Sequence, residues 1–181
     1  MIFFILAYLI WVVTTPVVAT ILALCGEKVV MLFDGHDITQ ALTSSGKTII
    51  LAYSPSPDGK PHTFNYRNIS YGTVFLLALI MAVPDVRPKL RVKILLLGLA
   101  FLLPVQLTRL VVHVFDYYGQ HMQMDGVSLY PVVYRKGLFF ANRVLTRIDG
   151  QVIPVVIWAA LYFYYVWYNK FFRKRTKPAR G

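Results

Sequence analysis

The sequence predicts an all-α polytopic membrane protein with four transmembrane helices, a small outer β-hairpin lobe and an amphipathic helix at the membrane interface. Three observations lead to this prediction. The 181 residues are 57% hydrophobic, compared with about 45–50% in soluble domains, and the mean hydropathy is +0.56. Four apolar stretches could each cross the hydrocarbon core, which takes about 20 residues as a helix. Basic residues gather in one short loop and in the C-terminal tail.

The expected segments divide the whole chain between membrane and water. In order they are transmembrane helix 1–24, outer lobe 25–68, transmembrane helix 69–84, cytoplasmic basic loop 85–91, transmembrane helix 92–117, outer segment 118–150, transmembrane helix 151–169 and cytoplasmic basic tail 170–181. The first helix contains Pro16 directly after two threonines, whose hydroxyls can bond freed carbonyls, so we expect a kink there. Gly26 is expected to end this helix. The last helix ends in Tyr and Trp residues, which favour the membrane–water boundary.

The positions of the basic residues predict the orientation of the chain. Lys and Arg in short loops and near helix ends mark the cytoplasmic side, so both termini are expected in the cytoplasm. The formal net charge of +11 lies largely in the 85–91 loop and the tail. Because this positive-inside pattern accounts for the charge, we expect the lipid bilayer as a partner and no nucleic acid.

The outer lobe is expected to contain a β-hairpin. Its β-forming runs at 47–54 and 62–68 are joined by a proline-rich turn containing Asp58-Gly59, and glycine accepts the positive φ that such turns need. Residues 27–46 follow no clean helical or strand period. A lobe of roughly 40 residues has too little core to stand alone, so it should rest on the helices or on a partner.

The second outer segment carries an amphipathic pattern. Apolar residues alternate there with four basic residues at near-helical spacing. The basic residues are Arg135, Lys136, Arg143 and Arg147. This pattern predicts a helix that lies in the interface and holds lipid phosphates or an acidic partner.

Polar side chains follow one face of the third apolar run. Gln106, Arg109, His113 and Asp116 are spaced three, four and three residues apart, which places them on the same side of a helix. Polar side chains in a lipid-spanning helix are costly and normally face other protein or a water-filled cavity. We therefore predict a binding surface or a polar helix contact along this face.

Arg109 and His113 are the candidates for chemistry within this stripe. Arg109 could bind a carboxylate or stabilise an oxyanion in a peptide or lipid-linked substrate. It could instead be a structural residue paired with Asp116, Asp149 or a free helix carbonyl, or one whose side chain reaches the headgroups. His113 could serve in acid–base catalysis near neutral pH, or it could be a hydrogen-bonding residue at the interface.

Cys25, at the expected outer end of the first helix, is a candidate thiol nucleophile beside Arg109 and His113. The alternative is a small buried hydrophobic residue. Because it is the only cysteine, no disulfide can form within the chain. The four histidines lack the i, i+3 or i, i+4 spacing of a metal site, so neither a metal nor a cofactor is expected. They are His36, His62, His113 and His121.

Three short motifs together resemble a known family. They are Asn68-Ile69-Ser70-Tyr71-Gly72, Leu103-Pro104-Val105-Gln106, and Gly150-Gln151-Val152-Ile153-Pro154 followed by Trp158. In this order and spacing they are similar to motifs of small membrane proteins associated with exosortases, over roughly residues 66–167. The resemblance implies a multi-pass protein of the bacterial inner membrane. It also implies a role in protein sorting as an accessory subunit with another integral membrane protein as partner.

A more distant resemblance is to the exosortase and archaeosortase transpeptidases themselves. That family uses a Cys opening one helix, an Asn-x-x-Arg element in the next helix and a later His. Gln106-Leu107-Thr108-Arg109 is similar to the second element, while Ser70-Tyr71-Gly72 stands at the place of the Cys element without the Cys. Arg147 and Asp149 stand where the His is expected. Because the thiolate attacks the peptide, the resemblance implies the shape of the family without its activity.

Two functions remain open from the sequence. The leading interpretation is a non-catalytic accessory subunit that contacts a membrane partner or substrate at the extracytoplasmic side. The alternative is a membrane transpeptidase or protease centred on Arg109, with Cys25 or Ser70 as the nucleophile and His113 as a further candidate.

Overall fold

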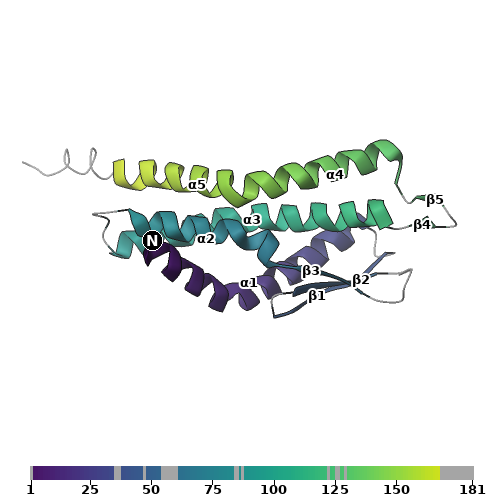
Figure 1. Cartoon of the computed structure of the whole chain (residues 1–181), viewed down its shortest axis with the longest axis horizontal. Helices are drawn as coiled ribbons and strands as arrows, with labels where there is room; N and C mark the ends of the chain where they lie inside the picture. The colour runs from purple at the N-terminus through teal and green to yellow at the C-terminus, as the bar shows by residue number, and fades with distance from the viewer. Residues whose placement is uncertain are drawn as a thin grey trace, which may run out of the picture.

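The computed structural model describes residues 2–34, 38–46, 48–53, 61–83, 86, 88–121, 123–124, 127–128 and 130–167. The helices are α1 (Ile2–Asp34), α2 (Arg67–Ala82), α3 (Pro88–His121), α4 (Val132–Arg147) and α5 (Ile153–Tyr162), with π-helical segments η1 (Ile148–Val152) and η2 (Phe163–Trp167). The strands are β1 (Thr39–Ser45), β2 (Thr48–Tyr53), β3 (His62–Asn65), β4 (Gln123–Met124) and β5 (Val127–Ser128). Figure 1 shows the helices lying along the long axis, with β1–β3 beside α1 towards the end where α3 and α4 are connected.

Three helical segments among the described residues are long and apolar enough to cross a membrane. They are Ile5–Asp34, Pro88–His121 and Val132–Tyr165. The apolar part of α2, Ile69–Ala82, is shorter. At 1.5 Å per residue, the 16 residues of α2 extend about 24 Å, against a hydrocarbon core of about 30 Å. The chain therefore has the helices of a multi-pass membrane protein, but the expected count of four spans is not confirmed.

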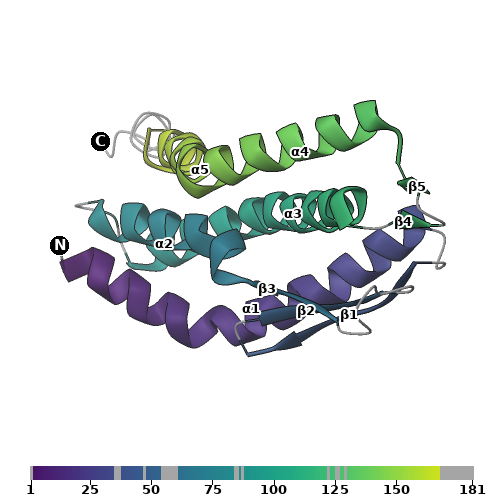
Figure 2. The ribbon, with the colours of Figure 1, turned by 45° about the vertical axis from the view of Figure 1, so that its right-hand side comes forward.

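α1 does not end at Gly26 but continues to Asp34. A Cβ at Gly26 would lie 2.8 Å from Leu110 Cδ2 and 3.0 Å from Leu42 Cδ2. Gly26 is therefore required for the close approach of α1 to α3 and β1, and it does not terminate the helix. Figure 2 shows that α1 is bent near its middle, and the helix contains Pro16.

The threonines before Pro16 bond to α1 itself. Thr14 Oγ1 donates to the Ile10 carbonyl over 2.9 Å, and Thr15 Oγ1 donates to the Trp11 carbonyl. Hydroxyls of this kind satisfy backbone groups that water cannot reach.

The outer lobe is a three-stranded antiparallel sheet in the order β1-β2-β3. The expected hairpin is present, because β2 pairs with β3 from Thr48↔Asn65 to Leu51↔His62. Its expected turn at 55–61 lies almost entirely outside the described residues. β1 adds a strand that the sequence did not predict, with Leu42 opposite Leu51.

One face of the sheet is packed against the helices. Buried side chains from the three strands and from α1 and α3 form a single core cluster, which includes Leu22, Val30, Leu42, Ile49, Leu51, Phe64, Leu110 and Val114. The lobe thus rests on the helices, as its small size requires.

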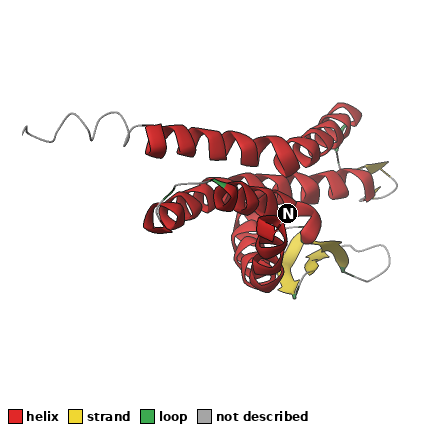
Figure 3. Cartoon of the chain, turned by 60° about the vertical axis from the view of Figure 1, so that its left-hand side comes forward, coloured by secondary structure: helices red, strands yellow, loops and turns green. Residues whose placement is uncertain are grey.

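α4 continues through η1 into α5 without a break, where the sequence predicted two separate helices. Figures 2 and 3 show from two sides that the axis changes direction between α4 and α5. π-helical turns inside α-helices are a recognised cause of such bends. α4 packs along the C-terminal half of α3, and η1 packs against α2.

Gly72 permits the contact between α2 and η1. A Cβ there would lie 2.6 Å from the Asp149 carbonyl oxygen. We expect Gly72→Ala to lower the free energy of unfolding by about 1–3 kcal/mol, because overpacking would displace η1. Thermal unfolding in detergent would measure this change.

Gly137→Ala is the matched control, because a Cβ at Gly137 meets nothing within 4 Å. Alanine there should stabilise α4 slightly, since glycine inside a helix costs about 1 kcal/mol. Equal stability of both variants would show that the α2–η1 contact is not close.

Candidate functional site

The polar stripe on α3 contacts three different elements. Gln106 faces α2, Arg109 faces η1, and His113 and Asp116 face α4. Gln106, Arg109 and Asp116 are buried, and His113 is half-buried. The structure therefore places the four predicted residues on one side of α3, as their spacing indicated, and gives each of them a polar partner.

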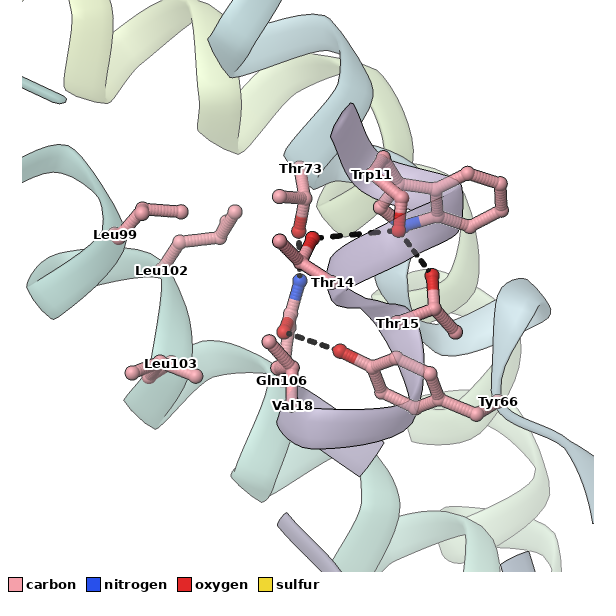
Figure 4. Close-up of a pocket in the computed structure, with 10 residues that line it drawn as sticks. All are labelled: Trp11, Thr14, Thr15, Val18, Tyr66, Thr73, Leu99, Leu102, Leu103 and Gln106. Atoms are coloured by element: carbon pink, nitrogen blue, oxygen red, sulfur yellow. Dashed lines mark hydrogen bonds between the residues drawn. The ribbon is translucent and has the colours of Figure 1, made fainter. Parts of the chain in front are cut away.

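Gln106 lies on the wall of a small cavity between α1, α2 and α3 (Figure 4). Its Nε2 donates to Thr73 Oγ1 over 2.8 Å, and its Oε1 accepts from the Tyr66 hydroxyl over 3.4 Å. The cavity has a volume of about 70 Å³ and is mostly apolar. Its lining residues are Trp11, Thr14, Thr15, Val18, Tyr66, Thr73, Leu99, Leu102, Leu103 and Gln106. The amide is held on both sides by residues from α2 and the turn before it.

Arg109 forms a buried ion pair with Asp149. Nη1 lies 3.0 Å from Asp149 Oδ2, and it also donates to the Ile69 carbonyl over 3.4 Å. The Asp149 side chain is fully buried, and its Oδ1 has no hydrogen-bond partner among the described residues. Two charges removed from water are tolerated only when they are paired. The pair therefore fixes the position of η1 on α3 and α2.

η1 is the local structure that turns Asp149 towards Arg109. The π-helical turn spans Ile148–Val152, and Asp149 is its buried residue. Extra residues in a helical turn re-aim a side chain, and π-turns are frequent at functional positions for this reason. Arg147 and Asp149 stand where the resemblance to exosortases leads one to expect a His. Asp149 is buried at the site, and Arg147 is exposed.

The first and third sequence motifs meet beside this ion pair. Ile69, in the first motif, accepts a hydrogen bond from Arg109. Gly72, also in the first motif, packs against the Asp149 carbonyl, which directly precedes the third motif. Segments far apart in the sequence thus meet around the guanidinium group of Arg109.

Asn142 holds His113 and Asp116 to α4. Its Nδ2 donates to Asp116 Oδ2 over 2.6 Å and lies 3.1 Å from His113 Nδ1. Gln120 Nε2 donates to Asp116 Oδ1 over 2.7 Å. Sequence reasoning missed Asn142. Its spacing of two helical turns from Asp149 was the available signal, since both residues then lie on the inner face.

The two candidate nucleophiles are not placed beside a base. Cys25 is exposed on α1, whereas Ser70 is fully buried and its Oγ accepts from Trp11 Nε1 over 3.1 Å. Among the described residues, no hydrogen bond joins either side chain to Arg109 or His113. The site holds a cation and a carboxylate in place, but it lacks the nucleophile–base contact that covalent catalysis uses.

The four predicted lipid-binding residues lie on α4. Lys136, Arg143 and Arg147 are exposed, and Arg135 is half-buried. The Arg143 guanidinium lies 4.7 Å from the centre of the Phe139 ring, as in a cation–π contact.

A column of stacked rings joins the sheet to α3. The His62 ring stacks on Tyr117 with centroids 3.7 Å apart, and Tyr117 stacks on His121 at 4.5 Å. Burial lowers the pKa of His62, and the nearby His113 and His121 lower it further. The folded protein therefore favours the neutral imidazole of His62 at the edge of the sheet.

Replacing either member of the ion pair should destabilise the protein. We expect Arg109→Gln or Asp149→Asn to lower the free energy of unfolding by about 3–5 kcal/mol, because each leaves an unpaired buried charge. The double variant Arg109→Met/Asp149→Leu should regain most of this loss. Arg147→Gln, at an exposed site, is the control and should change stability by less than about 0.5 kcal/mol. Thermal unfolding in detergent would test all four, and additive losses in the double variant would contradict the pairing.

The lowered pKa of His62 predicts that acid weakens the fold. An unfolded His binds a proton near pH 6.5, and the folded protein binds it less readily. Stability should therefore be greatest above about pH 6.5 and should fall as the pH decreases through and below that value. His62→Gln should flatten the dependence of the thermal midpoint on pH. An unchanged slope would show that other groups control it.

Comparison with known protein families gives a match over most of the chain. The family described as exosortase H-associated membrane protein matches residues 1–164. Comparison with curated proteins and with solved structures gives no match. The match covers all the elements that build the site, from α1 to α5.

Proposed function

This chain belongs to the exosortase H-associated membrane proteins, and from that membership we propose that it is a non-catalytic accessory subunit of an exosortase. It binds its partner within the bacterial inner membrane and contacts the partner or its substrate at the extracytoplasmic side. The description of the family supports an exosortase as the membrane partner. The apolar helices α1, α3 and α4–α5 are long enough to cross a membrane.

The observation that carries the proposal is the ion pair between Arg109 and Asp149. The sequence resemblance to the exosortases implies an arrangement in which a Cys, an Arg and a His come from three consecutive helical segments. Here Asp149 bonds to the Arg109 guanidinium, and Ser70 stands in place of the Cys. A carboxylate held by an arginine does not activate a thiol, and no thiol is present at this position. The geometry therefore suits a structural relative of the enzyme better than a second enzyme.

The proposed orientation places both termini in the cytoplasm, which requires the shorter helix α2 to cross the membrane as well. The 85–91 loop and the basic tail support it by the positive-inside rule. The sheet and α4 lie at the opposite end from the N-terminus (Figure 1), and in this orientation they are extracytoplasmic. They are then the parts that an exported substrate would meet.

The alternative function is a transpeptidase or protease centred on Arg109. It is favoured by one feature, the bond from Arg109 to the Ile69 carbonyl next to Ser70. It would require Ser70 to leave its bond with Trp11 and to find a base. It would otherwise require Cys25 to act from an exposed position on α1.

Co-purification tests the proposed association. The tagged chain would be expressed with the exosortase of its own genome, extracted in mild detergent and purified by the tag. We expect the exosortase to be retained, while a tagged polytopic protein of similar size retains none. Absence of the exosortase, from membranes that contain both proteins, would contradict the proposal.

Substrate processing separates the two functions. We expect cells carrying Cys25→Ser or Ser70→Ala to process exosortase substrates at the unaltered rate. Loss of processing in either variant, at a normal protein level and with co-purification intact, would establish the enzymatic alternative. Equal processing with lost co-purification would instead assign that residue to the interface.

A further inference from the structure

α4 is a helix without a buried residue. It contacts the protein along one side, through α3 and η1. Its remaining surface carries large apolar side chains, with Val133 83% exposed and Phe140 70% exposed. The other exposed apolar residues of α4 are Val132, Tyr134 and Phe139. An apolar surface of this kind on one helix needs a cover.

The charged residues of α4 are all basic. No Asp or Glu occurs between Val132 and Arg147. With about 100° of rotation per residue, Lys136, Arg143 and Arg147 fall within an arc of about 40°. Phe140 and Val133 lie directly beside this arc. The free surface of α4 is therefore divided into a basic row and an adjacent apolar strip.

The position of α4 along α3 places the basic row at the edge of the membrane. α3 begins with Lys89, Arg91 and Lys93, and a hydrocarbon core starting after Lys93 would extend about 20 residues, to His113. Asn142 contacts His113 and bonds to Asp116. This part of α4 therefore lies where the hydrocarbon core meets the headgroups.

Each basic residue can reach the headgroup layer from its own level. Arg143 follows Asn142 directly, and its guanidinium is supported by the Phe139 ring. Arg147 lies about one turn deeper, which the length of an arginine side chain can span. Lys136 lies about two turns farther out, on the water side of the layer.

A groove at the outer end of the row adds a further donor. It has a volume of about 310 Å³ and lies between the end of α3 and the start of α4. Arg135, Lys136 and Gln120 line this groove, and the buried Nε of Arg135 has no hydrogen-bond partner among the described residues. A Cβ at Gly119 would lie 3.3 Å from Arg135 Cγ, so the glycine leaves room for the arginine side chain in this position.

We propose that α4 is a binding surface for anionic phospholipid in the leaflet on the side of the sheet. The phosphates bind the basic row and the Arg135–Lys136 groove, and the apolar strip lies against the acyl chains. The mixture of basic and apolar side chains at the headgroup level favours a lipid over an acidic protein, which would leave the apolar strip uncovered. This proposal does not rest on the proposed association with an exosortase.

The single cysteine allows a direct test. A polarity-sensitive fluorophore is attached to Phe140→Cys, or to Val133→Cys, in a Cys25→Ser background of the full chain. The protein is reconstituted into vesicles of phosphatidylcholine with increasing phosphatidylglycerol, and the uncharged quencher acrylamide is present on both sides. We expect phosphatidylglycerol to protect both probes from quenching, whereas inorganic phosphate added to phosphatidylcholine vesicles does not.

Charge-removed variants show whether the basic row is responsible. With Arg143→Gln/Arg147→Gln, the apparent affinity for phosphatidylglycerol that protection reports should fall about tenfold or more, because each basic residue near a membrane surface is worth about a fivefold change in binding. Lys89→Gln/Lys93→Gln removes the same charge at the opposite end of α3 and should leave it unchanged. The thermal midpoint confirms that each variant is folded. Protection that is absent, that does not depend on phosphatidylglycerol, or that is equal in both variants would overturn the proposal.

Discussion

The ion pair between Arg109 and Asp149 is the interaction on which the arrangement of the helices depends. It joins α3 to η1, and the bond from Arg109 to the Ile69 carbonyl adds the start of α2. A buried charge that loses its partner is strongly unfavourable. Moving either α3 or η1 away from the other would therefore leave an unpaired buried charge, which is unfavourable. The backbone contact at Gly72 brings α2 close enough for this arrangement.

The rest of the polar stripe applies the same principle at other levels of α3. Lipid tails are as apolar as leucine, so the hydrophobic effect does little to hold helices together within the membrane. Hydrogen bonds from Gln106 to Thr73 and from Asn142 to Asp116 give each neighbouring helix a defined position instead. The polar groups of the stripe are therefore bonded to neighbouring helices rather than left open within the bundle.

The sequence could predict those features that depend on one segment alone. The face of the stripe follows from its spacing, and the β2–β3 pairing follows from its β-forming runs and turn. Features that depend on packing were missed. β1 shows no alternation, since only Thr39 and Leu42 are buried within it. A glycine such as Gly26 is typical of a helix end. Its place inside α1 is explained only by packing, because a Cβ at this position would lie too close to Leu110. The spacing of Asn142 from Asp149 indicates the inner face of α4, but the sequence alone does not identify its partners on α3.

The π-helical segment η1 also sets the rotational phase of α4 relative to α5. In an α-helix, successive residues are rotated about the helix axis by about 100°. One residue more or fewer in η1 would therefore rotate all of α4 about its axis by that angle relative to α5. Asp149 would leave Arg109, and the basic row would face a different side of the molecule. The length of η1, five residues, thus couples the interior ion pair to the direction in which the outer surface points. Homologues that keep the Arg109–Asp149 ion pair and the length of η1 are therefore expected to keep the direction in which the basic row of α4 points.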